Sequence, residues 1–276
     1  MLRTRVITAL ALLALLLPVL YFNYFPGFAV LVLAFFAAAI WENGRLFGKA
    51  QGTVAVYVWT ALFALILFKA DLTNAKLFFA LCVAIWAIRL APALGLKLPA
   101  METFANKLLG SIYGIAILGC FVAIVQLFRH SPLYLLSVLA LVWLADIGAY
   151  FCGKAFGKRK LAITISPGKS WEGAIGGAIV VMLACVAVVL TASGQPLLQD
   201  TFVYRLFAAW GWAGMALVIA AIVAASVVGD LFESMLKRRA GMKDSSNLLP
   251  GHGGVLDRID ALIPVLPLAA LVDSFF

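Results

Sequence analysis

A ten-residue stretch near the C-terminal end, Gly251 to Asp260, combines a histidine, three glycines, an arginine and two aspartates in an otherwise apolar sequence. Asp257 and Asp260 are three residues apart, and Asp230 stands in the same relation to Glu233. Side chains at this spacing lie on one face of a helix, so each pair can act together. Membrane spanning alone does not require these residues, and they therefore indicate a functional site.

Asp146 is a lone carboxylate within an apolar segment, close to the polar end of that segment. A charge at such a depth is costly, so the expected role is a functional group that faces a cavity. A structural ion pair with a lysine such as Lys154 is the alternative. Gly148, Gly153 and Gly157 reduce the bulk of this helix face and of the turn after it, which permits close approach of a neighbouring helix or ligand.

The sequence SPGKSWEG, from Ser166 to Gly173, contains a Pro-Gly pair that is typical of a turn. Lys169 and Ser170 offer hydrogen-bond donors, and Glu172 falls in the first turn of the next expected helix, where an acid is favoured by the helix dipole. Two interpretations remain open at this point. A capped helix start explains most of the residues, whereas a phosphate-binding turn explains the lysine better.

Basic residues accompany the acids in the same part of the chain. Lys237, Arg238 and Lys243 follow Asp230, and cations in such a position can hold phosphate charge. The alternative is a basic face that contacts lipid headgroups, which we favour for Arg239.

The acidic side chains offer only oxygen as a metal ligand, because no cysteine or histidine pair accompanies them. Oxygen-only sites favour Mg²⁺ or Mn²⁺, and Mg²⁺ usually arrives with substrate phosphates. Carboxylates, a hard metal and basic groups together describe phosphoryl or nucleotidyl transfer. The candidate metal ligands are Asp146, Asp230, Asp257 and Asp260.

The elements that must position these residues are membrane helices. The chain has 276 residues, of which 65% are hydrophobic and 12% charged, and its mean hydropathy is +1.09. Such a composition lies far outside the range of soluble globular proteins. We expect an all-α fold, a polytopic integral membrane helical bundle with a polar cavity open to the cytoplasm. The cysteines are too far apart for a zinc site or a disulfide framework and are interpreted as packing residues: Cys82, Cys120, Cys152 and Cys185.

About nine transmembrane helices are expected, because nine apolar segments approach the roughly 20 residues that cross a bilayer. The fourth is the least secure, since it ends at a charged residue and could be tilted or re-entrant. The segments are Val6–Phe22, Phe28–Trp41, Thr53–Phe68, Leu77–Leu90, Ser111–Phe128, Pro132–Phe151, Ala174–Ala192, Trp212–Val228 and Ala261–Phe276.

The distribution of positive charge predicts the orientation of these helices. Loops on the cytoplasmic side carry the excess of Lys and Arg, and a cytoplasmic N-terminus places all but four of the 21 such residues on that side. The C-terminus is then expected outside. The four exceptions are Lys69, Lys76, Arg129 and Arg205.

Polar residues divide the chain into two expected regions. Residues 1–110 form N-terminal transmembrane helices, and residues 111–276 form a catalytic transmembrane region. Within the second region, the cytoplasmic loops 152–173 and 229–260 hold most of the polar side chains and are where chemistry is expected.

From Ser234 to Asp260 the chain carries an ordered set of polar and small residues: Ser234, Lys237, Arg238, Lys243, Asp244, Ser246, Leu249, Pro250, His252, Gly253, Gly254, Val255, Asp257, Arg258, Ile259 and Asp260. This pattern resembles the signature of the phosphatidate cytidylyltransferases, also called CDP-diglyceride synthetases. The segments DIGAYFCGKAFGK and SPGKSWEG also resemble motifs of that family, although many relatives carry a basic or amide residue where this chain has Gly168. The resemblance covers about the last half of the chain.

The resemblance implies that CTP and phosphatidate give CDP-diacylglycerol and pyrophosphate, in phospholipid biosynthesis and with Mg²⁺ as cofactor, for which Mn²⁺ is a possible substitute. It also implies a homodimer in the bacterial inner membrane. The expected partners are CTP, phosphatidate and membrane lipid, and no nucleic acid is expected.

The resemblance also implies roles for individual residues. Asp230 and Asp257 would be the primary metal ligands, with Asp260 and Asp146 as further ligands or as groups behind them. His252 would be an acid to pyrophosphate or a donor that fixes the loop, and Gly251 with its neighbours would fold the backbone around phosphate or metal. Phosphate contacts would come from Lys169, Lys237, Arg238 and Lys243, and other substrate contacts from Ser170, Ser234, Asp244, Gly253, Gly254 and Arg258.

Two other classes of protein share some of these features. A secondary transporter also buries carboxylates, but inverted repeats and interrupted helices at matched positions are not found in the sequence. A CDP-alcohol phosphotransferase is similar in substrate chemistry but uses a spaced aspartate pattern that this chain lacks.

Overall fold

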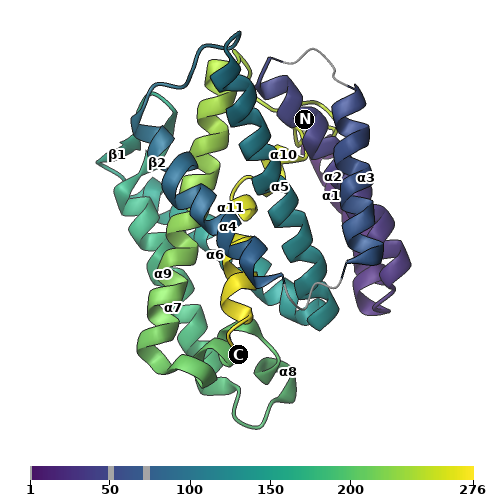
Figure 1. Cartoon of the computed structure of the whole chain (residues 1–276). Helices are drawn as coiled ribbons and strands as arrows, with labels where there is room; N and C mark the ends of the chain where they lie inside the picture. The colour runs from purple at the N-terminus through teal and green to yellow at the C-terminus, as the bar shows by residue number, and fades with distance from the viewer. Residues whose placement is uncertain (1, 49–52, 71–74) are drawn as a thin grey trace.

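The computed structural model describes residues 2–48, 53–70 and 75–276. Long helices run side by side, and one small hairpin lies at an end of the bundle (Figure 1). In chain order the elements are α1 (Leu2–Tyr21), α2 (Phe25–Leu46), α3 (Thr53–Lys69), α4 (Lys76–Ile85), η2 (Trp86–Leu90), η3 (Pro92–Gly95), α5 (Phe104–His130), α6 (Pro132–Phe156), β1 (Lys160–Ala162), β2 (Ser166–Ser170), α7 (Trp171–Thr191), α8 (Pro196–Gln199), α9 (Phe202–Arg239), α10 (Leu256–Ile259) and α11 (Leu262–Asp273).

All nine apolar segments expected from the sequence correspond to helices in the described parts of the chain. Six described helices are long and apolar enough to cross a membrane, while α3 and α11 are shorter apolar helices. The helical membrane fold is therefore confirmed, and the number of nine spans stays a prediction. Lys49, one of the lysines expected on the cytoplasmic side, lies outside the described residues.

Several helices extend beyond the apolar segments that predicted them. Helix α2 continues to Leu46 rather than ending at Trp41, and α6 continues to Phe156 rather than Phe151. In α2 the added turn holds Glu42 and Asn43, whose side chains find hydrogen-bond partners inside the protein, which hydropathy does not report. The fourth segment bends instead, since α4 passes through the π-helical turn η2 into the 3₁₀ turn η3.

Helices α6 and α7 pack very closely, and glycines make this possible. A Cβ atom added at Gly177 would lie 2.5 Å from the carbonyl oxygen of Ala145, and one at Gly148 would lie 3.1 Å from the Cα of Gly177. Small residues at a helix interface let two backbones approach within a membrane. The expected thin face of the helix around Gly148 is confirmed.

Helix α11 occupies the centre of the bundle (Figure 1). Nine of its twelve residues are buried, and it packs against α4, α5 and α9. Twelve residues span about 18 Å, less than the roughly 30 Å of a hydrocarbon core. The segment predicted as the ninth span is thus a short helix inside the protein.

The loop expected at 152–173 contains the antiparallel strands β1 and β2. Within the part of the chain that the structure describes, this pair is the one sheet in an otherwise helical fold. Glu172 holds the segment just before β1. Its carboxylate accepts hydrogen bonds from the backbone N–H of Lys158 (3.1 Å) and of Arg159 (3.1 Å). These contacts fold the strands back over the start of α7. The hairpin, α10 and the N-terminus lie at one end of the bundle, whereas α8 and the C-terminus lie at the other (Figure 1).

Candidate active site

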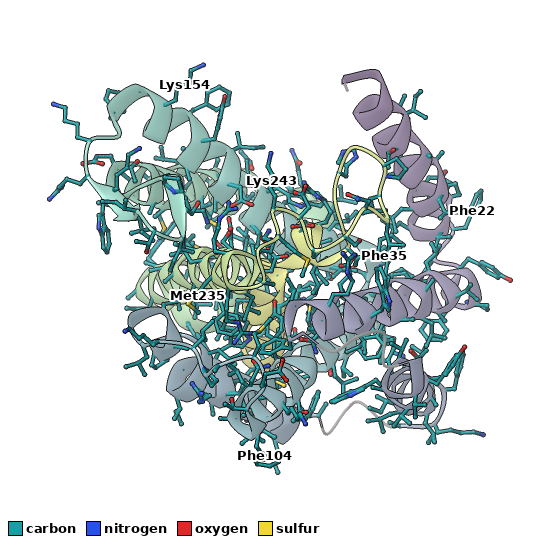
Figure 2. The ribbon with its side chains drawn as sticks, turned by 90° about the horizontal axis from the view of Figure 1, so that it is seen from above. Phe22, Phe35, Phe104, Lys154, Met235 and Lys243 are labelled. Atoms are coloured by element: carbon teal, nitrogen blue, oxygen red, sulfur yellow. The ribbon has the colours of Figure 1, made fainter. Side chains whose placement is uncertain are left out.

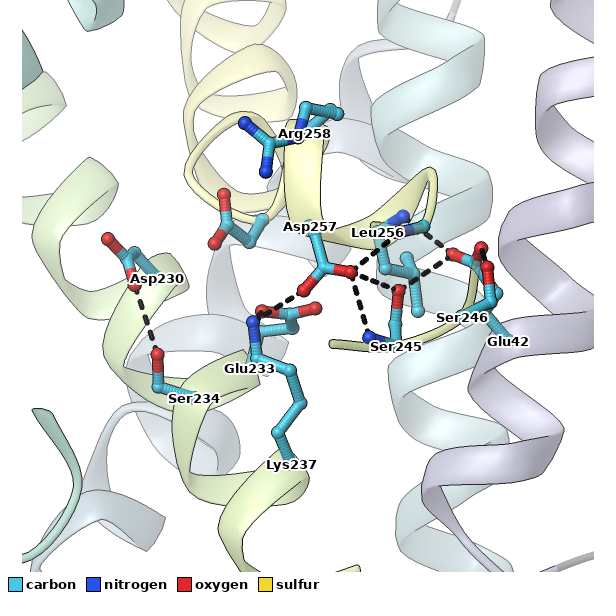
Figure 3. A network of polar contacts seen from close by, with 12 residues as sticks. Glu42, Asp230, Glu233, Ser234, Lys237, Ser245, Ser246, Leu256, Asp257 and Arg258 are labelled. Carbon is cyan, nitrogen blue, oxygen red and sulfur yellow. Dashed lines mark hydrogen bonds and ion pairs between the residues drawn. The ribbon is translucent and has the colours of Figure 1, made fainter. Parts of the chain in front are cut away.

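One face of the last turns of α9 carries the charged residues that the sequence pointed to (Figure 3). The Ser234 hydroxyl donates to Oδ1 of Asp230 at 3.2 Å, one turn earlier. Lys237, a further turn along, forms ion pairs with Glu233 and with Asp257 of the following loop. Asp230 therefore shares a helix face with a neighbour at helical spacing, as expected, and the neighbour that it contacts is Ser234.

A cavity of about 440 Å³ opens between α6, the hairpin, α7 and α9. Asp146, Lys154, Lys169 and Asp230 line it, and Lys169 Nζ forms an ion pair with Oδ2 of Asp230. Asp146 is exposed to this space and forms no ion pair with Lys154, although both residues are described. The cavity-facing interpretation of Asp146 is therefore the one that the geometry favours.

The position of Lys169 is fixed by the start of α7. Ser170 is the N-cap of this helix, and its Oγ accepts a hydrogen bond from the backbone N–H of Gly173 at 3.1 Å. Such a cap satisfies one of the free N–H groups of the first turn. A Cβ at Gly153 would lie 3.3 Å from the Ser170 hydroxyl, so α6 passes directly over it. The capped helix start is confirmed, and it leaves Lys169 directed toward Asp230.

The loop after α9, residues 240–256, wraps around the carboxylate of Asp257. Oδ2 accepts hydrogen bonds at 2.8 Å from the backbone N–H of Ser245, from the Ser245 hydroxyl and from the backbone N–H of Gly254. Oδ1 faces Lys237 Nζ at 2.6 Å. Burial alone would raise the pKa of Asp257, but these hydrogen bonds, led by the one from Lys237, lower it.

The glycines of this loop permit that wrapping. Gly251 and Gly253 have φ values of 76° and 84°, a region that other residues rarely adopt. A Cβ at Gly253 would lie 2.8 Å from Oδ2 of Asp257. The loop therefore folds tightly around a carboxylate of the protein itself, rather than presenting Gly254 N–H to a phosphate, because that N–H is already used.

Asp260 is in the opposite electrostatic situation. Burial, together with the negative charge of Asp230, raises its pKa to about 7. Its Oδ1 accepts a hydrogen bond from the backbone N–H of Ala261 at 2.8 Å. Gly229 brings the two elements together, since a Cβ there would lie 2.4 Å from the Asp260 carbonyl oxygen. Asp230 and Asp260 are thus neighbouring acids that a bound cation would stabilise.

Other predicted site residues lie toward the surface of this end. Arg238, Lys243, Asp244 and Arg258 are exposed. Figure 2 looks down on this end and shows Lys243 near its middle and Lys154 at its edge.

His252 lies beneath Arg258 in the same loop. The Arg258 Nε donates to the His252 carbonyl oxygen at 3.0 Å, and Nδ1 of His252 is buried without a hydrogen-bond partner. The contact that fixes the loop is thus made by the backbone carbonyl of His252 and not by its ring.

Arg239 has partners within the protein, which the lipid-headgroup interpretation did not include. The Arg239 guanidinium donates to the carbonyl oxygens of Leu46 and of Pro99, each at 3.4 Å, and lies over the ring of Phe47 at 4.9 Å. Carbonyl groups left free at the end of α2 offer an acceptor that a count of charges in the sequence does not reveal. Arg239 therefore joins the end of α9 to α2 and to the segment before α5.

Two buried acids near the site were missing from the set of site residues expected from the sequence. Glu233 is fully buried, and its Oε1 has no hydrogen-bond partner. Glu42, on α2, is also fully buried and contacts the loop around Asp257 (Figure 3). The helical spacing from Asp230 indicates Glu233 as a neighbour, whereas Glu42 lies just beyond the second apolar segment, which ends at Trp41.

A ready-made metal cage is not formed. Among the described residues, no three His, Cys, Asp or Glu side chains converge as metal ligands would. The two lysines already occupy the space beside Asp230 and Asp257. This arrangement fits a hard cation only if a ligand supplies further oxygens, which is the usual way that Mg²⁺ enters phosphate sites.

Comparison with known proteins gives an independent result. Residues 3–276 match the profile of the cytidylyltransferase family. The chain is 37% identical to a phosphatidate cytidylyltransferase of Haemophilus influenzae, over 97% of this chain and 96% of that protein. It is 42% identical to a phosphatidate cytidylyltransferase of Pseudomonas aeruginosa, over 98% of this chain and 96% of that protein.

Proposed function

From the membership of this chain in the cytidylyltransferase family, we propose that the cluster around Asp230, Lys169 and Lys237 is the active site of a phosphatidate cytidylyltransferase. The protein is a nucleotidyltransferase of the membrane, and it transfers a cytidylyl group from CTP to phosphatidate. The products are CDP-diacylglycerol and pyrophosphate. One observation carries the assignment of the site: a cavity within the helix bundle that is lined by both lysine and aspartate side chains.

The reaction needs charge neutralisation more than it needs a base. The phosphate of phosphatidate is anionic near neutral pH, and one of its oxygens attacks the α-phosphorus of CTP. As that bond forms, the bond from the α-phosphorus to the oxygen bridging to the β-phosphate breaks, and pyrophosphate leaves with the electron pair. Two anions must approach each other, so fixed cations at the reacting phosphates supply most of the catalysis.

Lys169 and Lys237 are placed for this task. Each is held in an ion pair with an acid, Asp230 for Lys169 and Asp257 for Lys237, before any substrate binds. An incoming phosphate can share these cations, and the acids keep the two ammonium groups oriented. Lys154, Arg238, Lys243 and Arg258 are exposed at the same end of the molecule, where they attract the anionic substrates.

We propose Mg²⁺ as the cofactor, with Mn²⁺ as a substitute. Asp230 and Asp260 are the ligands we favour, with Asp146 lining the same cavity as Asp230. Asp257 is less suited, because Lys237 and three donors of the loop already surround its carboxylate, whereas Asp230 meets only Ser234 and Lys169 among the described residues. When bound, the ion neutralises phosphate charge and orients the leaving pyrophosphate. The raised pKa of Asp260 supports this role, since a buried acid beside another acid favours a cation as neighbour.

The finer topology is also a proposal. We place nine helical segments in a bacterial inner membrane, the last of them the short enclosed helix α11, with the N-terminus and the site loops in the cytoplasm, where CTP is found, and the C-terminus outside. The polar cavity then opens to the cytoplasm, and the enzyme is a homodimer by its resemblance to the family. A cysteine at the exposed Asn247 in a cysteine-free protein should be labelled from the cytoplasmic side only.

The function is tested with purified protein in detergent. Phosphatidate is supplied with each of the four ribonucleoside triphosphates in Mg²⁺ buffer, and again with EDTA. We expect CDP-diacylglycerol and pyrophosphate from CTP only, and no product without a divalent cation. Equal turnover of all four nucleotides would overturn the substrate assignment, and full activity in EDTA would overturn the metal.

A further inference from the structure

Glu42 lies on α2, far in sequence from the residues that surround the reacting groups, yet it is fully buried beside them. Three donors converge on its carboxylate: the backbone N–H of Val255 (2.9 Å) and the Ser246 hydroxyl (2.5 Å) reach Oε1, and the backbone N–H of Leu256 (2.7 Å) reaches Oε2. The Ser245 hydroxyl lies 3.1 Å from Oε2 and shares its one proton between this oxygen and Asp257.

The loop is shaped to admit this carboxylate. A Cβ at Gly254 would lie 2.3 Å from Oε1 of Glu42 and 2.1 Å from the Ser245 hydroxyl. Only glycine leaves room for the side chain of Glu42 to reach the two N–H groups behind it. The second glycine of the Gly-Gly pair is therefore explained by a residue more than two hundred positions earlier.

A continuous path of contacts leads from Glu42 to the lysine at the reacting phosphates. The Ser245 hydroxyl lies between Oε2 of Glu42 and Oδ2 of Asp257, at 3.1 Å and 2.8 Å. Asp257 in turn holds Lys237 through its other oxygen at 2.6 Å. Figure 3 shows the path crossing from α2, through the loop, to α9. Glu42 itself touches neither the cavity nor Lys237.

We propose that Glu42 is a positioning residue for cytidylyl transfer, which fixes the loop of residues 245–256 so that Asp257 holds Lys237 in its catalytic orientation. This inference rests on the proposed function for its kinetic test but not for its structural one. It assigns the N-terminal helix α2 a part in the active site.

Glu42→Gln is the most specific variant, because it keeps the size of the side chain while it removes the charge and replaces one acceptor oxygen with an NH₂ donor. Each oxygen of Glu42 faces one backbone N–H, so either orientation of the amide places an NH₂ group against a donor that cannot rotate away. The loop must then move. Misplacement of a catalytic group by about 1 Å costs up to roughly a hundredfold in rate.

The kinetic test measures kcat and the KM values for CTP and phosphatidate per folded molecule, with Glu102→Gln as control, because Glu102 is an exposed acid in the same half of the chain. We expect kcat to fall at least about tenfold in Glu42→Gln, with both KM values within about threefold of the parent protein. A fall in kcat of less than threefold would overturn the proposal.

A double-mutant cycle separates positioning from a general structural role. If Glu42 acts through Asp257, Glu42→Gln should cost less than threefold further in kcat when Asp257→Asn is already present. Independent losses that multiply would contradict the path through Asp257. If Glu42→Gln does not fold, Ser246→Ala replaces it, since that change removes one donor and leaves the carboxylate, and an unchanged kcat would again overturn the proposal.

Amide hydrogen exchange gives a readout that does not depend on activity. In the parent protein the N–H groups of Val255 and Leu256 should exchange slowly, and in Glu42→Gln their exchange should accelerate at least tenfold while the helices keep their protection. Unchanged exchange would refute the anchoring role even in an active enzyme. Conversely, faster exchange in a chain that never uses CTP would support the anchor and refute only the proposed function.

Discussion

The two ends of the helix bundle each carry a polar cluster, and the clusters differ in their balance of charge. At the end that holds α8, each acid meets neutral or cationic donors: the Ser131 hydroxyl donates to Asp200 at 2.9 Å, and the Tyr134 hydroxyl donates to Asp273 at 2.6 Å. Arg205 faces Asp200 at 3.5 Å. We call this group the distal cluster: His130, Ser131, Tyr134, Asp200, Arg205 and Asp273.

The cluster at the other end, which we call the site cluster, has more acids than cations. Its members are Glu42, Asp146, Lys169, Asp230, Glu233, Lys237, Ser245, Ser246, Asp257 and Asp260. Two lysines lie among four acids of α9 and the following segment, namely Asp230, Glu233, Asp257 and Asp260. Of these acids, Asp260 has a pKa raised to about 7. Perturbed acids of this kind collect at functional sites. In the distal cluster both acids have side-chain donors, which join the helices, whereas the six acids of the site cluster outnumber its two lysines and suit a ligand that brings further cations.

The largest expected effect is that of Asp257→Asn in the site cluster. The asparagine keeps the shape but removes the charge that holds Lys237, and its amide NH₂ faces either Lys237 or the backbone N–H groups of Ser245 and Gly254, none of which can accept a hydrogen bond. Removal of one well-placed electrostatic group commonly costs about a hundredfold or more in rate. We expect that loss in kcat, measured at equal amounts of folded protein across a Mg²⁺ titration. Near-normal rates would make the site cluster a structural one.

Lys169→Met should have the next largest effect. It removes the cation that faces Asp230 in the cavity, and a hydrogen bond to a charged group contributes roughly 1.5 to 3 kcal/mol, or about tenfold or more in rate. Initial rates with CTP and phosphatidate measure the loss. Lys160→Met is the control, because Lys160 is an exposed lysine on the same hairpin. Equal losses in the two variants would show that only the overall charge of the hairpin matters.

Arg239→Ala should reduce stability more than rate. It removes two hydrogen bonds to backbone carbonyls and the contact with Phe47, which together contribute roughly 1 to 3 kcal/mol. We expect a lower midpoint of thermal unfolding in detergent and a kcat within about threefold of the parent, by the same reasoning. A stability change that vanishes at high salt would restore the headgroup interpretation, since contacts with lipid charge are screened by salt.

Asp200→Asn should have the smallest effect and defines the distal cluster as structural. Asp200 is partly exposed, and such ion pairs contribute about 1 kcal/mol or less. Asparagine retains an acceptor for the Ser131 hydroxyl. We expect unchanged kcat and a slightly lower unfolding midpoint, measured beside Asp257→Asn in one preparation. A large loss of activity would mean that the two ends of the bundle are coupled.

The parts of the site that lie within one local segment were predictable from the sequence. Helical spacing placed Asp230 on one face with either Glu233 or Ser234, and a capped helix start was one of the two interpretations of the segment from Ser166 to Gly173. These relations depend on a few neighbouring residues, so periodicity and capping rules capture them.

The contacts that join distant segments were not predictable in the same way. Glu42 follows an apolar run directly, and an acid at the end of a span usually faces water, so its burial against the loop has no local signal. The contacts of Arg239 within the protein were missed for the same reason, because the carbonyl oxygens that accept its hydrogen bonds lie on α2 and before α5. Asn43, the residue after Glu42, is buried as well. The burial of both polar side chains follows from the extension of α2 to Leu46, which the sequence did not predict.

The burial of α11 has a consequence for biosynthesis. The helices that surround it, α4, α5 and α9, precede it in the chain and therefore leave the ribosome first. They must meet in the bilayer around a space that is still empty, or remain apart until α11 arrives. Asp257 and Asp260 enter the assembly together with α11, so the proposed site is incomplete at every earlier stage of synthesis. If these residues act as proposed, activity begins only when α11 has joined the bundle.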